Sequence, residues 1–355
     1  MPDYRAWFDK SLIKIHDHKV DALIRLKTCL SLLLLFAVGP LPASAQCDVY
    51  VANREANSVS VFNTLTNSLE AVVPVGNQPL RVAITPNRAF AYVTNTAHLG
   101  LLISNTVSAI DTTTHQVVAT IPVGQYPNGL AITPNGAFVY VANLSSNSVS
   151  VIDTATQTVT ATVAVGMSPW RVAITPDGAF AYVTDSGASN VSVIDTTTNM
   201  VVAAVAVGNY PAGVAITPNG AFAYVTNYIS NAVSVIDIAT RQVVATVAVG
   251  RSPVDVAITP NGAFAYVVND SGEDVSVIDT STNAVVSTVP VGLAPRGVAI
   301  TPDGAFAYVT NEDSSTVSVI STATNTVVDT VQGAAVVPEG LAITLPPNAV
   351  NQTCR

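Results

Sequence analysis

Short apolar runs that alternate large and small side chains recur through the body of the chain, and none shows the 3.6-residue period of a helix. Within residues 213–250 these runs predict four strands, Val214–Thr217, Ala221–Thr226, Val233–Ile236 and Gln242–Val249. Val, Ile, Thr, Tyr and Phe fill the runs, whereas Pro, Asn, Asp and Gly separate them, which is typical of strands joined by tight turns.

The four-strand unit is repeated along the chain. Its first strand carries an Ala-Ile-Thr triplet whose isoleucines are spaced mostly 42 residues apart, with one step of 48 that adds a loop within residues 95–105. Seven copies are present, with the isoleucine at Ile84, Ile132, Ile174, Ile216, Ile258, Ile300 and Ile343. Four antiparallel strands in about 42 residues is the length of a propeller blade.

The second strand of each unit suits packing between blades. It places Phe222 and Tyr224 on one face and the small Ala221, Ala223 and Val225 on the other. The large face of one blade can then fill the small face of the next, so both faces are buried. This agrees with a chain that is 49% apolar and has a mean hydropathy of +0.45.

The run ITPDGAFAYVTN at 300–311, with VSVI at 317–320, resembles the YVTN-type β-propeller repeat, and the resemblance covers about residues 48–345. It implies an all-β, seven-bladed β-propeller of four-stranded antiparallel blades. It also implies a secreted or surface protein, as in archaeal surface layers, and says little about activity.

The two ends of the repeat region predict how the ring closes. The first unit begins at a second strand near Tyr50, and the last ends after a first strand near Thr344, so the last blade is expected to combine strands from both termini. Cys47 and Cys354 then fall close to the missing turn and are predicted to form a disulfide. In the chain-entropy model, a disulfide that closes a loop of about 300 residues stabilises the folded protein by roughly 5 kcal/mol. Two unpaired thiols are the alternative.

Residues 1–45 are interpreted as a signal peptide that precedes a single propeller, 46–355. Lys27, the apolar run 30–38 and the Ala43-Ser44-Ala45 cleavage motif are typical of secretory leaders. A start codon assigned too early explains the long stretch before the leader. A lipoprotein is disfavoured because Gln46, not a small residue, precedes Cys47. We therefore expect export to the periplasm, the medium or the cell surface.

The remaining chain is acidic. It has eight arginines, no lysine and 19 carboxylates, for a net charge of −11. This charge disfavours nucleic acid, and it offers no basic patch for anionic lipid. We expect no membrane insertion of the mature chain, and the oligomeric state is left open.

Strand parity assigns the connections to two rims. The turn rim holds the first-to-second and third-to-fourth connections, which are monotonous Pro-Asn-Gly and Asp-x-x-Thr turns. A calcium site there is disfavoured, because no loop has the dense oxygen spacing of known calcium loops. The variable rim holds the other connections, together with the pairs that precede each first strand.

Binding is expected at the variable rim, around the mouth of the central channel, because repeat folds vary where they bind ligands. Drift on an exposed rim is the alternative for any single residue. The candidate binding residues are Arg81, His98, Tyr126, Trp170, Arg171, Tyr210, Asp255, Arg296 and Glu339. Seven Asx residues at the ends of the second strands are interpreted as structural caps of the following loops.

Catalysis is not the favoured interpretation. The mature chain has two histidines, His98 and His115, on opposite rims, and no Gly-x-Ser-x-Gly motif. We expect no cofactor or metal and an exported, non-catalytic binding or surface-structural protein that recognises protein or glycan. The alternative is a lactonase- or lyase-like enzyme with a polar or cation-dependent site at the channel mouth, built from residues such as Asp255, Glu339 and Arg171.

Overall fold

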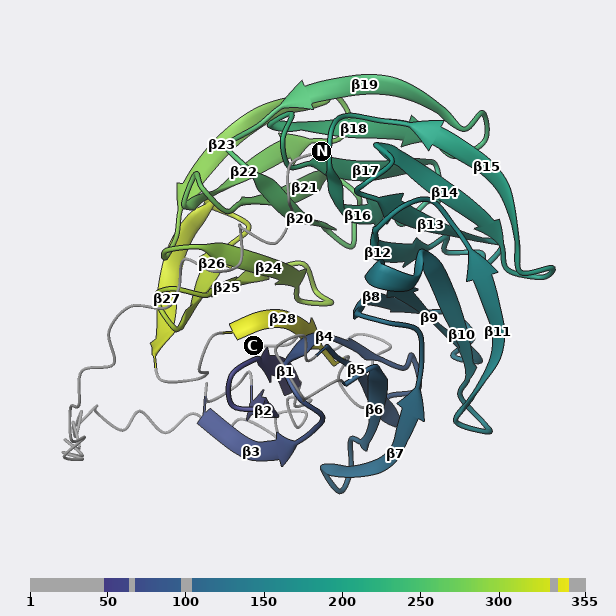
Figure 1. The fold of residues 1–355 in the computed structure, drawn as a ribbon. Helices are drawn as coiled ribbons and strands as arrows, with labels where there is room; N and C mark the ends of the chain where they lie inside the picture. The colour runs from purple at the N-terminus through teal and green to yellow at the C-terminus, as the bar shows by residue number, and fades with distance from the viewer. Residues whose placement is uncertain (1–47, 64–67, 97–103, 333–337, 345–355) are drawn as a thin grey trace, which may run out of the picture. The chain divides into compact units, whose positions relative to one another are not determined.

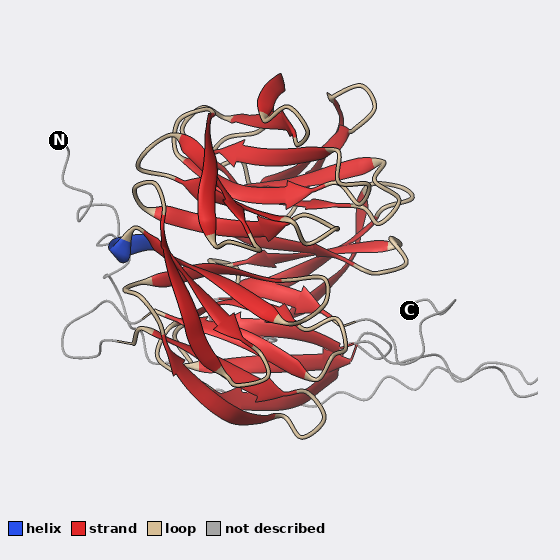
Figure 2. Cartoon of the chain, turned by 90° about the vertical axis from the view of Figure 1, so that its right-hand side faces the viewer, coloured by secondary structure: helices blue, strands red, loops and turns tan. Residues whose placement is uncertain are grey.

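The computed structural model describes residues 48–63, 68–96, 104–332 and 338–344, all in one compact unit. These residues form seven four-stranded antiparallel sheets (Figure 1), with one short 3₁₀ helix, η2 (Leu144–Ser146). Nearly all the described chain is strand or tight connection (Figure 2). Within the described ranges, no helix is long and apolar enough to cross a membrane.

Each sheet runs from an inner strand at the axis to an outer strand at the edge. The inner strands are β4 (Pro79–Ile84), β8 (Pro127–Ile132), β12 (Pro169–Ile174), β16 (Pro211–Ile216), β20 (Pro253–Ile258), β24 (Pro295–Ile300) and β28 (Pro338–Ile343). The second strands are β1 (Asp48–Asn53), β5 (Phe90–Asn95), β9 (Phe138–Asn143), β13 (Phe180–Asp185), β17 (Phe222–Asn227), β21 (Phe264–Asn269) and β25 (Phe306–Asn311).

The other two strands complete each sheet. The third strands are β2 (Ser58–Asn63), β6 (Thr106–Asp111), β10 (Ser148–Asp153), β14 (Asn190–Asp195), β18 (Ala232–Asp237), β22 (Asp274–Asp279) and β26 (Thr316–Ser321). The outer strands are β3 (Ser68–Pro74), β7 (Gln116–Pro122), β11 (Thr158–Ala164), β15 (Met200–Ala206), β19 (Gln242–Ala248), β23 (Ala284–Pro290) and β27 (Thr326–Gln332). The predicted all-β propeller of seven antiparallel blades is confirmed.

The ring is closed by the composite sheet that the sequence predicted. β28 pairs antiparallel with β1, with Tyr50 opposite Ala342. Thr344 extends the pairing, because its hydroxyl accepts the amide hydrogen bond of Asp48 at 2.7 Å. Each inner strand contacts the inner strands of both neighbouring sheets, and β28 contacts both β24 and β4. Cys47 and Cys354 lie outside the described residues, so their disulfide stays a prediction.

The core consists of side chains packed between adjacent sheets. Tyr224 is fully buried and packs with Val256, Ala265 and Ile278 of the following sheet, as the large-to-small alternation predicted. Its hydroxyl donates to Asn283 Oδ1 of that sheet at 2.7 Å. Burial of each such aliphatic side chain stabilises the fold by about 1.5–3 kcal/mol, and the contact recurs between successive sheets.

Candidate active site

The inner strands begin earlier than the sequence predicted. The first strand of the 213–250 unit was expected from Val214, but β16 starts at Pro211. A proline fits the first residue of a strand because it has no N–H to contribute to the ladder. The pairing register then shifts, for example between Pro211 and Val214. The variable pairs, such as Trp170 and Arg171, therefore lie on the inner strands that surround the axis, not in the loops before them.

Large and small residues alternate at the third position of the inner strands from β4 to β24, and β28 has a second glycine in succession. Arg81, Arg171 and Asp255 occupy this position in β4, β12 and β20, and the other inner strands have glycine there. A Cβ at Gly129 would lie 3.0 Å from Arg171 Cδ, and one at Gly340 would lie 2.6 Å from Arg81 Cδ. These two glycines thus let the backbone and the arginine side chain of the next inner strand approach closely.

Arg171 and Asp255 form a buried ion pair at the axis, with Nη2 of Arg171 3.3 Å from Oδ2 of Asp255. The amide of Val298 donates to the same oxygen at 3.4 Å. Within the part of the chain that the structure describes, neither Nε nor Nη2 of Arg171 makes a hydrogen bond. Burial raises the pKa of Asp255, and Arg171 offsets part of this rise. The pair thus offers unused donors beside a carboxyl whose pKa is raised.

A second ionic network joins β28 and β24 to the neighbouring loops of the variable rim. Nη1 of Arg54 lies 3.3 Å from Oε1 of Glu339 and 3.8 Å from Oε1 of Glu312. Arg296 pairs with Glu312 through Nε and with Asp270 through Nη1, the latter at 3.1 Å. Burial and the charge of Glu312 raise the pKa of Glu339, although the nearby arginines act in the opposite direction.

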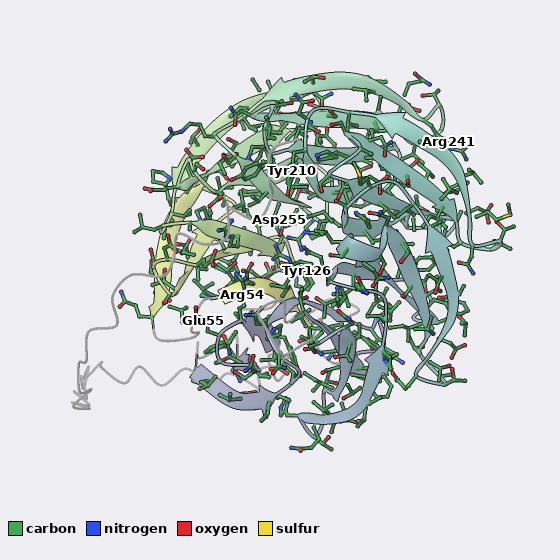
Figure 3. All side chains as sticks on the ribbon, viewed as in Figure 1. Arg54, Glu55, Tyr126, Tyr210, Arg241 and Asp255 are labelled. Carbon is green, nitrogen blue, oxygen red and sulfur yellow. The ribbon has the colours of Figure 1, made fainter. Side chains whose placement is uncertain are left out.

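The two ionic groups belong to one cluster. Arg171 lies close enough to Glu339 for the two charges to interact, although their strands belong to well-separated sheets. Arg81 reaches across to donate to the carbonyl oxygens of Glu339 at 3.0 Å and Arg296 at 3.3 Å. We call this set the axial cluster: Arg54, Arg81, Arg171, Asp255, Asp270, Arg296, Glu312 and Glu339. In Figure 3, Arg54 and Asp255 lie near the middle of the ring of sheets, and Arg241 lies at its periphery.

Aromatic side chains lie on the same rim. The rings of Trp170 and Tyr210 are 6.3 Å apart, and those of Tyr210 and Tyr228 are 5.8 Å apart. The hydroxyl of Tyr228 donates to Oδ2 of Asp270 at 3.4 Å, which connects this aromatic wall (Trp170, Tyr210 and Tyr228) to the axial cluster. Burial raises the pKa of Tyr126, which lies near Arg54 and Glu339.

The sequence analysis missed three members of the axial cluster. Arg54, Asp270 and Glu312 each follow the last residue of a second strand directly. That position varies from blade to blade, so the reasoning applied to the inner strands could have found them. The structure brings Arg81, Arg171, Asp255, Arg296 and Glu339 together, with Trp170, Tyr210 and Tyr126 on the same rim. His98 lies outside the described residues.

The Asx residues at the ends of the second strands have a structural role, as expected. Their side chains contact neighbouring strands and sheets in addition to the loops that they were expected to cap. Nδ2 of Asn269 donates to the hydroxyl of Ser276 at 2.8 Å on the neighbouring third strand. A Cβ at Gly250 would lie 2.5 Å from the same Nδ2, so the side chain packs against the glycine of the loop from the outer strand of the preceding sheet. These side chains are buried within the blades and do not form a ligand ring.

The turn rim is built from local hydrogen bonds. Asp153 Oδ1 accepts the backbone N–H groups of Ala155 and Thr156 at 2.9 and 2.8 Å, as an Asx turn requires. His115 lies on this rim, where Nδ1 is 3.3 Å from the Tyr50 hydroxyl. Over the described ranges, no group of three or more His, Cys, Asp or Glu side chains could hold a metal ion.

The closed ring, with ionisable groups gathered at its axis, defines a seven-bladed β-propeller with a polar axial site. The family model for the seven-bladed β-propeller lactonases matches residues 67–165 and 162–285. The chain belongs to this lactonase family. No curated protein sequence matches the chain.

Solved structures of similar fold include several enzymes. Hydrazine synthase from Kuenenia stuttgartiensis is 26% identical, with a TM-score of 0.69 over 77% of this chain and 92% of that chain. A putative 6-phosphogluconolactonase from Bacteroides fragilis is 20% identical, with a TM-score of 0.71 over 86% of this chain and 100% of that chain. The periplasmic gluconolactonase of Pseudomonas aeruginosa is 19% identical, with a TM-score of 0.71 over 85% of this chain and 100% of that chain.

The family membership corrects two predictions from the sequence. The expected non-catalytic binding or surface-structural protein is wrong, and so is the expectation that the chain is not an enzyme, because the lactonase family points to an enzyme. Catalysis was ranked second because the mature chain has few histidines and no nucleophile motif, whereas the axial cluster consists of arginine and carboxylate side chains. The lactonase-like alternative agrees with the family.

Proposed function

We propose that the protein hydrolyses a lactone at the axial cluster. The observation that carries this proposal is the Arg171–Asp255 pair, in which buried, unused guanidinium N–H groups lie beside a carboxylate whose pKa is raised. A hydrolase of a cyclic ester needs these two functions: donors for the oxygen that becomes negative and a base for the attacking water.

The proposed reaction assigns one role to each residue. Nε–H and Nη2–H of Arg171 donate to the carbonyl oxygen of the lactone. The carboxylate of Asp255 takes a proton from a water molecule as its oxygen bonds to the carbonyl carbon. When the tetrahedral intermediate collapses, the bond from this carbon to the ring oxygen breaks, and Asp255 returns the proton to that oxygen. One lactone and one water thus give one hydroxy acid, which then ionises and releases one proton to the solvent.

The short separation within the pair supports this assignment. Arg171 Nη2 and Asp255 Oδ2 are 3.3 Å apart, so a carbonyl oxygen and an attacking water can occupy adjacent positions beside the two groups. We assign the binding of the rest of the substrate to the variable rim. The aromatic wall and Tyr126 would contact its ring, and Arg81, Arg296 and Glu339 would hold the walls of the site in place.

Four further expectations from the sequence remain proposals: the repeat type, the leader, the disulfide and a role for His98. We infer that the blades are of the YVTN type, with ITPDGAFAYVTN as the clearest copy. We further propose that residues 1–45 are removed on export, that 46–355 form the mature propeller, and that Cys47 and Cys354 form a disulfide there. A role for His98 at the site is likewise a proposal.

The first experiment compares two Arg→Lys variants of the purified protein. Arg171→Lys keeps a positive charge opposite Asp255 but loses the planar donor fork, so we expect kcat/KM for an aldonolactone to fall about 100-fold. Arg241→Lys is the matched control, because Arg241 lies 5.0 Å above the Phe180 ring, away from the axis, and should keep full activity. Hydrolysis is followed by acid release in a pH-stat, with the uncatalysed rate subtracted.

Two results would contradict the proposal. A wild-type protein that hydrolyses no lactone above the uncatalysed rate is not a lactonase of the kind proposed. If Arg171→Lys instead retains wild-type kcat/KM, the reaction takes place elsewhere on the propeller. The folded state of both variants is checked by thermal unfolding, so that a loss of activity is not confused with a loss of structure.

A further inference from the structure

Buried threonine hydroxyls connect neighbouring inner strands close to the axis. Four second strands carry a fully buried threonine immediately before their final Asx residue: Thr94, Thr184, Thr226 and Thr310. Each hydroxyl accepts a hydrogen bond from the backbone N–H of the third residue of the inner strand in its own sheet. The hydroxyls of Thr94, Thr184 and Thr310 also donate to a carbonyl oxygen of the inner strand in the next sheet. A single hydroxyl group thus joins two adjacent sheets.

Thr184 holds the backbone of Arg171. The pairing of β12 with β13 shifts between Pro169 and Val172, and Arg171 lies within this shift. Thr184 Oγ1 accepts the N–H of Arg171 at 3.0 Å, and the same hydroxyl donates to the carbonyl oxygen of Ala212 in β16 at 2.7 Å. The Thr184 hydroxyl therefore gives hydrogen-bond partners to two buried backbone groups, one in each of two inner strands.

The side chain of Arg171 is itself held at few points. Its ion pair with Asp255 spans 3.3 Å, and its Nε and Nη2 make no hydrogen bond among the described residues. A Cβ at Gly129 of β8 would lie 2.7 Å from Arg171 Cα, so the preceding inner strand packs directly against the arginine backbone. The direction of the guanidinium consequently depends on where the backbone places Arg171 Cα. A misplacement of about 1 Å can lower a catalysed rate about 100-fold.

The position of Thr184 does not require a hydroxyl for the blade to form. The equivalent residue of β21 is Val268, and in β1 and β9 it is Ala52 and Ala142. All three are fully buried, as Thr184 is. Valine has nearly the shape of threonine without its hydroxyl, so this chain already contains a sheet with that side chain in the same place. The requirements of the blade therefore do not explain the hydroxyl of Thr184.

We propose that Thr184 is a positioning residue for lactone hydrolysis and acts through the backbone of Arg171. This inference rests on the proposed function. The hydroxyl ties the N–H of Arg171 to the inner strand of the next sheet. It thereby keeps Nε and Nη2 directed at the place where the carbonyl oxygen of the lactone becomes negative. Thr184 does not touch the substrate, because it is fully buried within the sheets.

The first test measures hydrolysis of D-glucono-1,5-lactone by purified Thr184→Val in a pH-stat. We expect kcat to fall about tenfold and KM to stay within about twofold of wild type, because the displaced donors act mainly in the transition state. Thr184→Ser keeps the hydroxyl and should restore kcat to within about threefold of wild type. Thr184→Ala, which places the residue of Ala142 in this sheet, should lower kcat as Thr184→Val does.

The matched control is Thr226→Val. The Thr226 hydroxyl accepts the N–H of Gly213 at 2.7 Å, but a glycine has no side chain to direct. Both valine variants leave a buried N–H without its partner, so both should lower Tm by about 2–6 °C. Only Thr184→Val should lower kcat, and Thr226→Val should keep it within about twofold of wild type.

A double variant tests whether Thr184 acts through Arg171. In the Arg171→Lys background, Thr184→Val should lower kcat by less than about threefold, because the donor fork that it positions is already absent. A loss of about tenfold in both backgrounds would show that the two residues act independently, and it would overturn the inference.

The outcomes separate the inference from the function on which it rests. If Thr184→Val and Thr226→Val lower kcat equally, or if Thr184→Ser does not restore it, the inference is wrong and lactone hydrolysis stands. If the wild-type protein hydrolyses no lactone above the uncatalysed rate, both fail. Thermal unfolding checks that each variant is folded, and Thr184→Ala decides the question if Thr184→Val is not.

Discussion

The turn rim and the variable rim are built by one repeat, yet their carboxylates are held in opposite ways. On the turn rim, exposed aspartates such as Asp153 and Asp195 accept backbone N–H groups of their own turns, which lowers the pKa of each. At the variable rim, burial raises the pKa values of Asp255 and Glu339. The first arrangement favours the ionised form, and the second works against it.

The comparison shows which residues serve the fold and which serve the site. A turn aspartate interacts with residues two and three positions away, so each blade can form its turns alone. The axial pairs join residues that are far apart in sequence, such as Arg54 and Glu339. Buried ion pairs seldom stabilise a protein more than apolar packing of the same volume would. Their presence at the axis therefore supports the proposed catalytic role more than a role in stabilising the fold.

The largest expected effect is loss of activity in Asp255→Asn. We expect kcat/KM for a sugar lactone to fall 10²- to 10⁴-fold, because the amide cannot take a proton from water. The pKa of Asp255 is raised in the folded protein, so the active, ionised form is lost as pH falls through a value above 3.8. Wild-type kcat/KM should therefore decline on the acid side above pH 3.8, and the residual activity of Asp255→Asn should lack that ionisation.

The matched variant on the turn rim is Asp195→Ala. In the described hydrogen bonds, the Asp195 carboxylate accepts from the backbone and hydroxyl groups of its own turn, so activity per folded molecule should stay within twofold of wild type. Both proteins are assayed by pH-stat from pH 4 to 8, after thermal unfolding confirms that each is folded. An unchanged acid limb in Asp255→Asn would assign the ionisation, and the role of base, to a different group.

The repeat made the fold predictable, because seven copies of one pattern reveal the strands, the turns and the closing sheet. The predicted start of the inner strands was too late, because a proline is more typical of a loop than of a strand. In the structure, β12 and the equivalent strands begin at that proline, Pro169 in β12. Arg171 and Asp255 could be named, since they break the repeat. The pairing of Arg54 with Glu339 could not, because it depends on how sheets are arranged around the axis. The lactonase-like enzyme was only the alternative interpretation, because an Arg–carboxylate site has no short sequence motif that would favour it.

An intermediate effect is expected at Asp185, the one aspartate among the described Asx residues that end the second strands. Asp185 is fully buried, and burial raises its pKa from 3.8 to about 6. Its protonated form is therefore favoured in the folded state. The stabilising contribution of that form is complete below pH 3.8 and is lost as pH rises through about 6. By linkage the penalty at pH 7 is about 2–3 kcal/mol.

Asp185→Asn should remove this penalty and raise the free energy of unfolding at pH 7 by about 2 kcal/mol. The asparagine can donate to Ser192, just as Asn227 donates to Ser234 at 2.9 Å in the next sheet. Asn227→Asp is the reverse control and should introduce a similar loss of stability above pH 6. Urea unfolding at pH 4, 5.5 and 7 measures both. If Asp185→Asn shifts stability equally at all three pH values, titration of this carboxyl is not the cause.

The smallest effect is expected on the turn rim at Arg88, which has a φ of +60° where the equivalent turns have glycine, as at Gly136 with a φ of +72°. A side chain in this left-handed region costs about 1–2 kcal/mol, and glycine loses about 0.5–1 kcal/mol of chain entropy instead. Arg88→Gly should therefore stabilise the protein by about 0.5–1 kcal/mol, or about 1–2 °C in Tm. Gly136→Arg should do the opposite, because a Cβ there meets only Pro86 at 3.4 Å, an ordinary contact, so backbone conformation alone is changed. A lower Tm for Arg88→Gly would mean that the arginine side chain stabilises the turn by more than its backbone conformation costs. Side-chain contacts would then matter on the turn rim as well as on the variable rim.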